Sequence, residues 1–279
     1  MTVAAKRSPE DNARMRAALS AAMKSAELTS FAIADLFFQY LKKTGQLKNK
    51  VFADVGANLG AWTYPFAQRY WRVYAFEAYS RNFEALTKKF AAHEDVKLIR
   101  RAVWNESGAA FDFYYNEARP GIGSLKNNSE HFREDRRETV ETITIANALG
   151  EDLQKLELIK ADVEGAELQA LQGADLARSQ PRLIIVEISG RSDAFGYHAD
   201  DLADYITAAS YRPYLVAARE IETDAIRRKF EVIHFAPYAA QKGKAGVGAN
   251  MDIVAVREDA GGEFEDLFAP HFRQHDALT

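Results

Sequence analysis

The short apolar run VFADV carries an acid near its end and is followed by regularly spaced glycines. The pattern reads Asp54-x-Gly56-x-Asn58-x-Gly60. Glycines let a backbone turn tightly and approach a ligand, and a helix that begins after such a turn offers free N–H groups to a carboxylate or phosphate. These four residues are therefore candidates for binding a ligand.

A second apolar run, VYAFE, ends in Glu77, which stands 21 residues after Gly56. This spacing is typical of an acid that accepts hydrogen bonds from both ribose hydroxyls of a nucleoside cofactor. Taken alone, the glycines could equally shape an ordinary turn, and Glu77 could be a solvated acid at a strand end. The combination favours a nucleoside site.

The loop after the first run also indicates which cofactor to expect. A dinucleotide fingerprint requires G-x-G-x-x-G, which this loop lacks, so a nicotinamide oxidoreductase is disfavoured. The carboxylate of Asp54 would repel a pyrophosphate but can receive an ammonium group, directly or through water. No G-x-x-x-x-G-K-[ST] motif occurs, which excludes a P-loop. The ligand should carry adenosine at one end and an amino acid at the other, a description that fits S-adenosylmethionine.

A third group of charges stands in the segment LIKADVEGAE. Alternation along a strand places Lys160 and Asp162 on one face, where they could form an ion pair. Charged groups at a buried strand end are costly unless they are used, which favours a functional role for Asp162 and Glu164. For Glu167 we expect a structural role, complementing the dipole of the following helix. Glu187, at the end of LIIVEI, is either a substrate contact or a partner of Lys160.

The elements that would position these residues are short apolar runs separated by helical segments. The runs VFADV, VYAFE, VKLIRRAV, LELIKADV and LIIVEI predict the strands of a mostly parallel sheet in a doubly wound, Rossmann-like α/β domain. Ligands of such sheets bind beyond the carboxyl ends of the strands, where the acids above stand. After Asp200, YRPYLVA, KFEVIHF and MDIVAVRE predict further strands, of which we expect the last two to pair as an antiparallel edge.

Two further segments flank or interrupt this pattern. Helices predicted from Ser8 to about Leu28 and over SFAIADLFFQYLKKTG form an N-terminal helical extension. We place the domain boundaries at 1–48 for this extension, 49–258 for the α/β domain and 259–279 for a C-terminal tail. Between the predicted strands FDFYY and ETVETITI, the polar stretch 116–137 is either a mobile cover of the site, with Ser124 close to substrate, or a solvated loop.

The composition bounds the classes of function. A hydrophobic fraction of 47% excludes disorder, and a net charge of −4 makes bulk nucleic-acid binding improbable. The absence of cysteine excludes disulfides and thiolate chemistry and fits a reducing compartment. The N-terminus has no apolar signal region, and no apolar stretch approaches the roughly 20 residues of a membrane span. We expect a cytoplasmic protein without a membrane span, and a homo-oligomer is compatible with the sequence.

The chain resembles the FkbM methyltransferases, within the class I S-adenosylmethionine-dependent enzymes. The matching stretches are VFADVGANLGAWT, VYAFEAYSRNFEAL, RRAVWNESG, GIGSL, LIKADVEGAELQALQGA and PRLIIVEI. The resemblance implies a Rossmann-like sheet, S-adenosylmethionine as cofactor and methyl transfer, typically to a hydroxyl on a sugar or natural product. The sequence departs from the family pattern at Ala78, where a proline is common, and at Ile145-Ala146, in place of Leu-Asp.

Carried over by position, the resemblance implies a cofactor site. Its residues would be Asp54, Gly56, Asn58 and Gly60 at the methionine end, Glu77 at the ribose, Ala102 and Val103 beside the adenine, and Asp162 at the cofactor ammonium. For Ala102 and Val103, simple core packing is an equal alternative.

Methyl transfer to a hydroxyl requires alignment of the acceptor and loss of its proton. Glu164 is the preferred general base, Asp162 would divide its interactions between cofactor and acceptor, and His198 is the rival base because its ordinary pKa suits the role. Magnesium held by Asp162, Glu164 and Glu187 is compatible with the sequence but not required, and we assign no metal site. A binding module that retains cofactor affinity without turnover is the alternative to an enzyme.

Overall fold

The computed structural model describes residues 26–69, 71–117, 121–127, 136–188, 191–224, 227–238, 250–259 and 262. They divide into two compact units, one of Asn49–Tyr205 and one that combines Met1–Lys48 with Ile206–Thr279. Most of the first predicted helix and most of the predicted C-terminal tail lie outside the described residues. The predicted domain boundaries therefore stay predictions.

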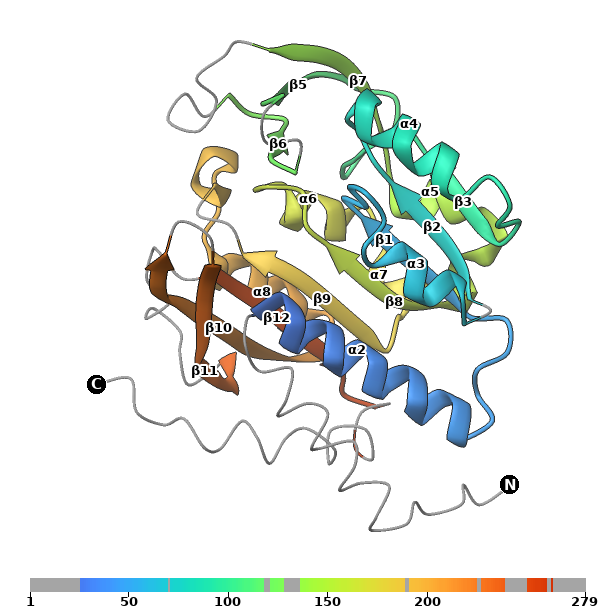
Figure 1. Cartoon of the computed structure of the whole chain (residues 1–279). Coiled ribbons are helices and arrows are strands. Elements are labelled where there is room, and N and C mark those ends of the chain that lie inside the picture. The colour runs from blue at the N-terminus through green and yellow to red at the C-terminus, as the bar shows by residue number, and fades with distance from the viewer. Residues whose placement is uncertain are drawn as a thin grey trace. The chain divides into compact units, whose positions relative to one another are not determined.

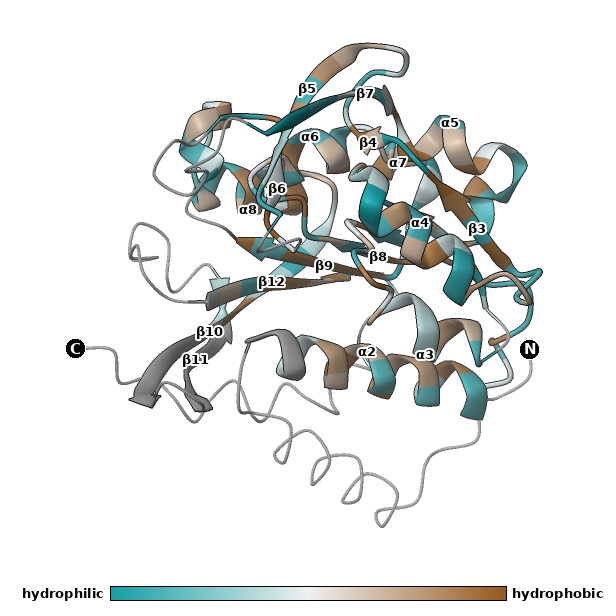
Figure 2. Ribbon diagram, turned by 45° about the horizontal axis from the view of Figure 1, so that its top comes forward, coloured by the Kyte–Doolittle hydropathy of each residue, from teal (hydrophilic) through white to brown (hydrophobic). Residues whose placement is uncertain are grey.

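Five parallel strands form the centre of the unit 49–205 (Figure 1), in the order β9-β8-β1-β2-β3. Their bounds are β1 (Val51–Val55), β2 (Arg72–Phe76), β3 (Val96–Ile99), β8 (Leu156–Ala161) and β9 (Leu183–Ile188). Every residue of β1 and β8 is buried, as expected for apolar strands covered on both faces. Figure 2 shows hydrophobic residues in brown along much of β9.

The order of these strands reverses between β1 and β8. From β1 the chain adds β2 and β3 on one side, and later adds β8 and β9 on the other. Because crossovers between parallel strands are right-handed, the helices of the two halves cover opposite faces of the sheet. The predicted doubly wound, Rossmann-like α/β fold is confirmed. In such folds the reversal marks the ligand site at the carboxyl ends of the strands.

Short helices connect the strands. Within this unit α3 contacts β2, α4 contacts β3, and α6 contacts both β8 and β9. The helices after the N-terminal one are α3 (Thr63–Ala67), α4 (Ser80–Lys89), α5 (Ile145–Leu149), α6 (Glu167–Gln172), α7 (Leu176–Ser179) and α8 (Ala199–Ala208), with 3-10 turns η1 (Gly150–Lys155) and η2 (Ser192–Phe195).

A second, four-stranded sheet has the order β4-β7-β5-β6. Its strands are β4 (Ala102–Val103), β5 (Ala110–Tyr115), β6 (Gly123–Ser124) and β7 (Arg137–Ile143). The prediction of VKLIRRAV as one strand is wrong in extent, because the chain turns at Arg101, whose N–H donates to the carbonyl of Ile99 at 3.1 Å. Ala102 and Val103 then pair with β7 instead of continuing β3.

The predicted strands FDFYY and ETVETITI are present as β5 and β7, which pair antiparallel. Of the stretch 116–137 between them, residues 118–120 and 128–135 lie outside the described residues. The predicted cover therefore stays a prediction. Its described part includes β6, which pairs with β5.

The other unit contains α2 (Ala26–Lys43), β10 (Tyr211–Asp224), β11 (Arg227–Pro237) and β12 (Asn250–Arg257). The predicted helix over SFAIADLFFQYLKKTG is confirmed, and Ser30 Oγ joins it to β12 by donating to Asp252 Oδ2 at 2.5 Å. The expectation that the last two strands pair with each other is wrong: β10 is long enough to pair antiparallel with β11 on one side and β12 on the other. Among the described residues, no helix has the length and apolar character needed to cross a membrane.

Candidate functional site

A pocket with about 650 Å³ of empty space opens where β1, β2 and β8 end. This space includes open solvent at the mouth of the pocket. Three carboxylates, Glu77, Asp162 and Glu164, line one part of it. An apolar wall lines another part, formed by Ala78, Tyr79, Ala102, Val103, Phe113 and Leu125, and Asn58, Asn82 and Arg101 also line the pocket.

The turn after β1 lies against the end of β8. Gly56 has a φ of +81°, and a Cβ added there would stand 1.8 Å from the carbonyl oxygen of Asp162. The N–H groups of Gly56 and Ala57 both donate to the carbonyl of Phe76, at 3.0 and 2.9 Å. Only glycine allows this approach, which brings the ends of three strands together. Gly56 and Asn58 line the pocket, as the sequence predicts.

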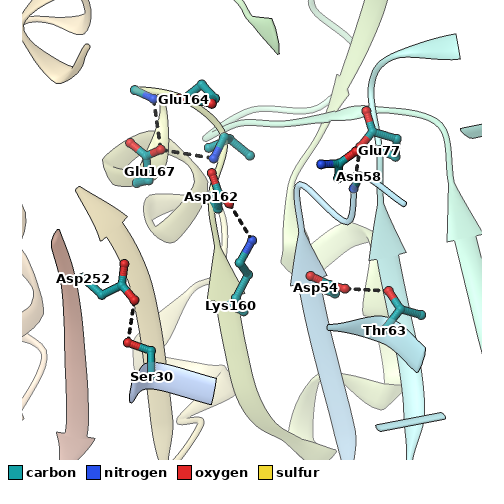
Figure 3. A network of polar contacts seen from close by, with 12 residues as sticks. Ser30, Asp54, Asn58, Thr63, Glu77, Lys160, Asp162, Glu164, Glu167 and Asp252 are labelled. Atoms are coloured by element: carbon teal, nitrogen blue, oxygen red, sulfur yellow. Dashed lines mark hydrogen bonds and ion pairs between the residues drawn. The ribbon is translucent and has the colours of Figure 1, made fainter. Parts of the chain in front are cut away.

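Glu77 lies at the end of β2 with its carboxylate between two backbone amides. Its Oε2 accepts from the N–H of Asn58 at 2.7 Å (Figure 3). Its Oε1 accepts from the N–H of Tyr79 at 2.8 Å. Burial raises the pKa of Glu77 to about 7, although both amides favour the charged form. Each oxygen keeps a lone pair that can accept a further hydrogen bond.

Two predicted cofactor residues do not line the pocket. Asp54 is fully buried, and its Oδ2 accepts from Thr63 Oγ1 at 2.5 Å. Burial raises the pKa of Asp54, and its Oδ1 has no hydrogen-bond partner. Gly60 lies against α4, where a Cβ would meet Phe90 at 2.7 Å and Leu86 at 3.0 Å. The structure thus buries Asp54 beside Thr63, away from the pocket lining, and gives Gly60 a packing role.

Lys160 and Asp162 form an ion pair of 2.9 Å at the end of β8 (Figure 3). Burial opposes the charge of Asp162, but Lys160, Glu187 and Arg191 together outweigh it and lower the pKa of this carboxyl. Burial likewise opposes the charge of Lys160, whereas Asp162 and Asp54 raise its pKa. Glu187 also interacts with both members of the pair. This favours the predicted alternative in which Glu187 is a partner of Lys160.

Glu164 follows in the loop between β8 and α6. Its backbone has a φ of +57°, and its carboxylate forms an ion pair with Arg191. Its carbonyl oxygen accepts from Ser124 Oγ of β6 at 3.0 Å. Burial, with the charge of Asp162 beside it, raises the pKa of Glu164 to about 7. A carboxyl with this pKa exchanges protons readily at neutral pH.

The other two candidates lie away from the pocket. Glu167 is 1% exposed, and its carboxylate accepts hydrogen bonds from two backbone amides of the loop that carries Glu164. Its role is structural, as predicted, but it acts through these two hydrogen bonds in addition to the helix dipole. His198 does not line the pocket: its ring is 77% exposed and its Nδ1 stands 2.8 Å from Asp193. The structure therefore brings Glu164, but not His198, to the site.

Several pocket residues were not predicted from the sequence. Asn82 of α4 donates to Asn58 Oδ1 at 3.1 Å and so supports the turn after β1. Phe113 enters from β5, and the absence of a side chain at Gly123 leaves room for its ring, which a Cβ would meet at 2.3 Å. Two sequence features could have indicated this contact: the alternation of apolar residues in FDFYY and the glycines of GIGSL. Within the described part of the chain, no group of three His, Cys, Asp or Glu residues is arranged to hold a metal ion.

Residues 54–213 match the model of the methyltransferase FkbM domain, a match that spans more than half of the chain. The chain belongs to the FkbM methyltransferase family. Methyl transfer is therefore its class of reaction. No curated protein sequence matches this FkbM-family chain.

Two solved structures illustrate the similarity of this chain to known proteins. A precorrin-6y C5,15-methyltransferase from Geobacter metallireducens GS-15 is 10% identical with a TM-score of 0.40, covering 75% of this chain and 81% of its own. A magnesium protoporphyrin IX methyltransferase from Synechocystis PCC 6803, solved with bound SAM, is 11% identical with a TM-score of 0.38, covering 82% and 83%. The FkbM-family chain is similar to both at low identity.

Proposed function

We propose that this methyltransferase uses S-adenosylmethionine to methylate a hydroxyl of a small molecule, a sugar or natural product. The observation that carries the proposal is the position of Glu77. Its carboxylate is fixed by two backbone amides at the pocket edge, and one lone pair on each oxygen remains for a ligand. Two adjacent oxygens in this arrangement match the two hydroxyls of a ribose.

The rest of the pocket fits the same cofactor. Ala102 and Val103 present small apolar surfaces beside Glu77, suited to the face of an adenine. The carboxylate of Asp162 lies where β8 ends, and its negative charge favours the amino acid ammonium of the cofactor. When bound, S-adenosylmethionine supplies a methyl group that is already activated on its sulfonium.

Glu164 is the residue proposed to take the proton of the acceptor hydroxyl. A general base works best when its pKa is close to the operating pH, and burial gives Glu164 a pKa of about 7. Arg191 holds its carboxylate in place. Asp162, whose pKa is lowered by Lys160, keeps its negative charge and would orient the cofactor ammonium or the acceptor.

A thermal-unfolding assay tests the cofactor. S-adenosylmethionine or its demethylated product should raise the melting temperature, whereas NAD should not, because the loop after β1 lacks the glycines that admit a pyrophosphate. An equal shift with NAD would refute the assignment.

Labelling tests the acceptor. A cell extract incubated with the protein and methyl-labelled S-adenosylmethionine should yield a labelled O-methyl product, which mass spectrometry identifies. Cofactor binding without any labelled product would instead support the alternative of a binding module.

A further inference from the structure

The carboxylate of Glu167 holds the loop between β8 and α6 from within the protein. Its Oε1 accepts from the N–H groups of Val163 and Gly165, at 3.1 and 3.0 Å (Figure 3). Its Oε2 accepts from the hydroxyl of Tyr197 at 2.9 Å. Glu167 does not line the pocket, so these contacts, rather than a ligand, account for its buried carboxylate.

The two amides bound by Glu167 flank Glu164. Glu164 has a φ of +57°, a left-handed conformation that is uncommon for a residue with a side chain. On its other side, the carbonyl oxygen of Glu164 accepts from Ser124 Oγ at 3.0 Å. The peptide groups around Glu164 are thus fixed by two side chains from different elements. A backbone conformation of this kind persists only where its surroundings hold it.

We propose that Glu167 is a positioning residue, which holds the backbone of Glu164 in the left-handed conformation and thereby directs the Glu164 carboxylate into the pocket. The proposal rests on the role of Glu164 in the proposed function. It assigns Glu167 no contact with cofactor or acceptor. The physical reason is that amides 163 and 165 share one acceptor oxygen, which fixes the turn between them.

Three variants separate positioning from charge and from stability. Glu167→Ala removes the acceptor of both amides. Glu167→Gln removes the charge but keeps an oxygen where Oε1 stands, so it should preserve the turn. Tyr197→Phe is the matched control. It removes the hydroxyl that donates to Oε2 of Glu167, while the two amides remain bound to Oε1.

The measurement is a pH titration of the Glu164 carboxyl by NMR of protein labelled with carboxyl-¹³C glutamate, assigned by the signal that Glu164→Gln removes. Titratable groups that act on Glu164 are Asp162, Arg191, Glu167 and Lys160. In the unmodified protein and in Tyr197→Phe, the midpoint should stay near 7, and in Glu167→Gln it should fall only by the part that the charge of Glu167 contributes. In Glu167→Ala it should move toward the ordinary value of 4.5, because the carboxylate leaves its buried place.

An unchanged midpoint in Glu167→Ala, or an equal shift in Glu167→Gln, would overturn the proposal, the second by showing that charge alone acts. If Glu167→Ala does not fold, Glu167→Asp replaces it, since the shorter side chain keeps the carboxylate but draws it away from the two amides. A midpoint that moves toward the ordinary value supports the proposal, and an unmoved one overturns it. This titration needs neither cofactor nor turnover, so a failure of the proposed function would appear separately, in the thermal and labelling assays.

Discussion

Glu77 should make the binding of adenosine depend on pH. Burial raises its pKa to about 7, so near neutral pH the free protein holds this carboxyl in both protonation states. Ribose hydroxyls donate hydrogen bonds and therefore favour the charged carboxylate. Adenosine is the suitable probe, because it carries the ribose without the titrating amino group of the complete cofactor. Its affinity should rise as the pH rises through 7.

The size of this effect follows from proton linkage. If bound adenosine lowers the pKa of Glu77 well below 6, the dissociation constant should fall about tenfold between pH 6 and pH 8, or about 1.4 kcal/mol. Binding at pH 7 should release about half a proton. Isothermal titration calorimetry measures both quantities, the second by comparing buffers of different ionisation enthalpy.

Glu77→Gln is the control variant for this prediction. It keeps the shape of the side chain but cannot ionise, so its adenosine affinity should be independent of pH and weaker at pH 8 by roughly 1–3 kcal/mol, the loss expected for charge-assisted hydrogen bonds. A pH-independent affinity in the unmodified protein, or the same pH dependence in Glu77→Gln, would refute the placement of the ribose at this residue.

Three further predictions concern the same site. Glu164→Gln should lower the methyl-transfer rate roughly 10²–10⁴-fold with unchanged cofactor binding; a normal rate, with slow turnover in His198→Ala, would transfer the role of base to His198. Gly56→Ala should lower the melting temperature or prevent folding, since its Cβ would stand 1.8 Å from a carbonyl oxygen, and a normal melting curve would contradict the close approach of this turn to Asp162. The stability contributed by protonated Glu77 is complete below its unfolded pKa of 4.5 and is lost as the pH rises through about 7, so the ligand-free protein should melt lower at pH 8 than at pH 5, and less so in Glu77→Gln.

Local patterns in the sequence determined the strands and the positions where they end. Apolar runs covered on both faces predicted β1, β2, β8 and β9, because burial on both sides of a sheet requires nearly continuous hydrophobic sequence. Since parallel strands present their carboxyl ends at one edge, the same runs indicated that Gly56, Asn58, Glu77, Asp162 and Glu164 gather there, and all five line the pocket.

The local sequence pattern could not determine where the backbone turns away to pair with another strand, or which residues each side chain contacts in the fold. The break after Ile99 depends on pairing with β7, some forty residues later, and therefore left no signal in VKLIRRAV. Asp54 carries the right charge for a ligand, yet packing against α3 pairs it with Thr63 instead.

Contacts made in the folded protein also set the chemistry of the acids. Glu164 acquires its raised pKa from burial and from Asp162, and its backbone conformation is braced by Ser124 of β6 and by Glu167. The sequence determined which acids could reach the edge of the sheet. Only the tertiary structure decided which are buried, paired or open to a ligand, because desolvation and hydrogen bonding depend on every element packed around each carboxylate.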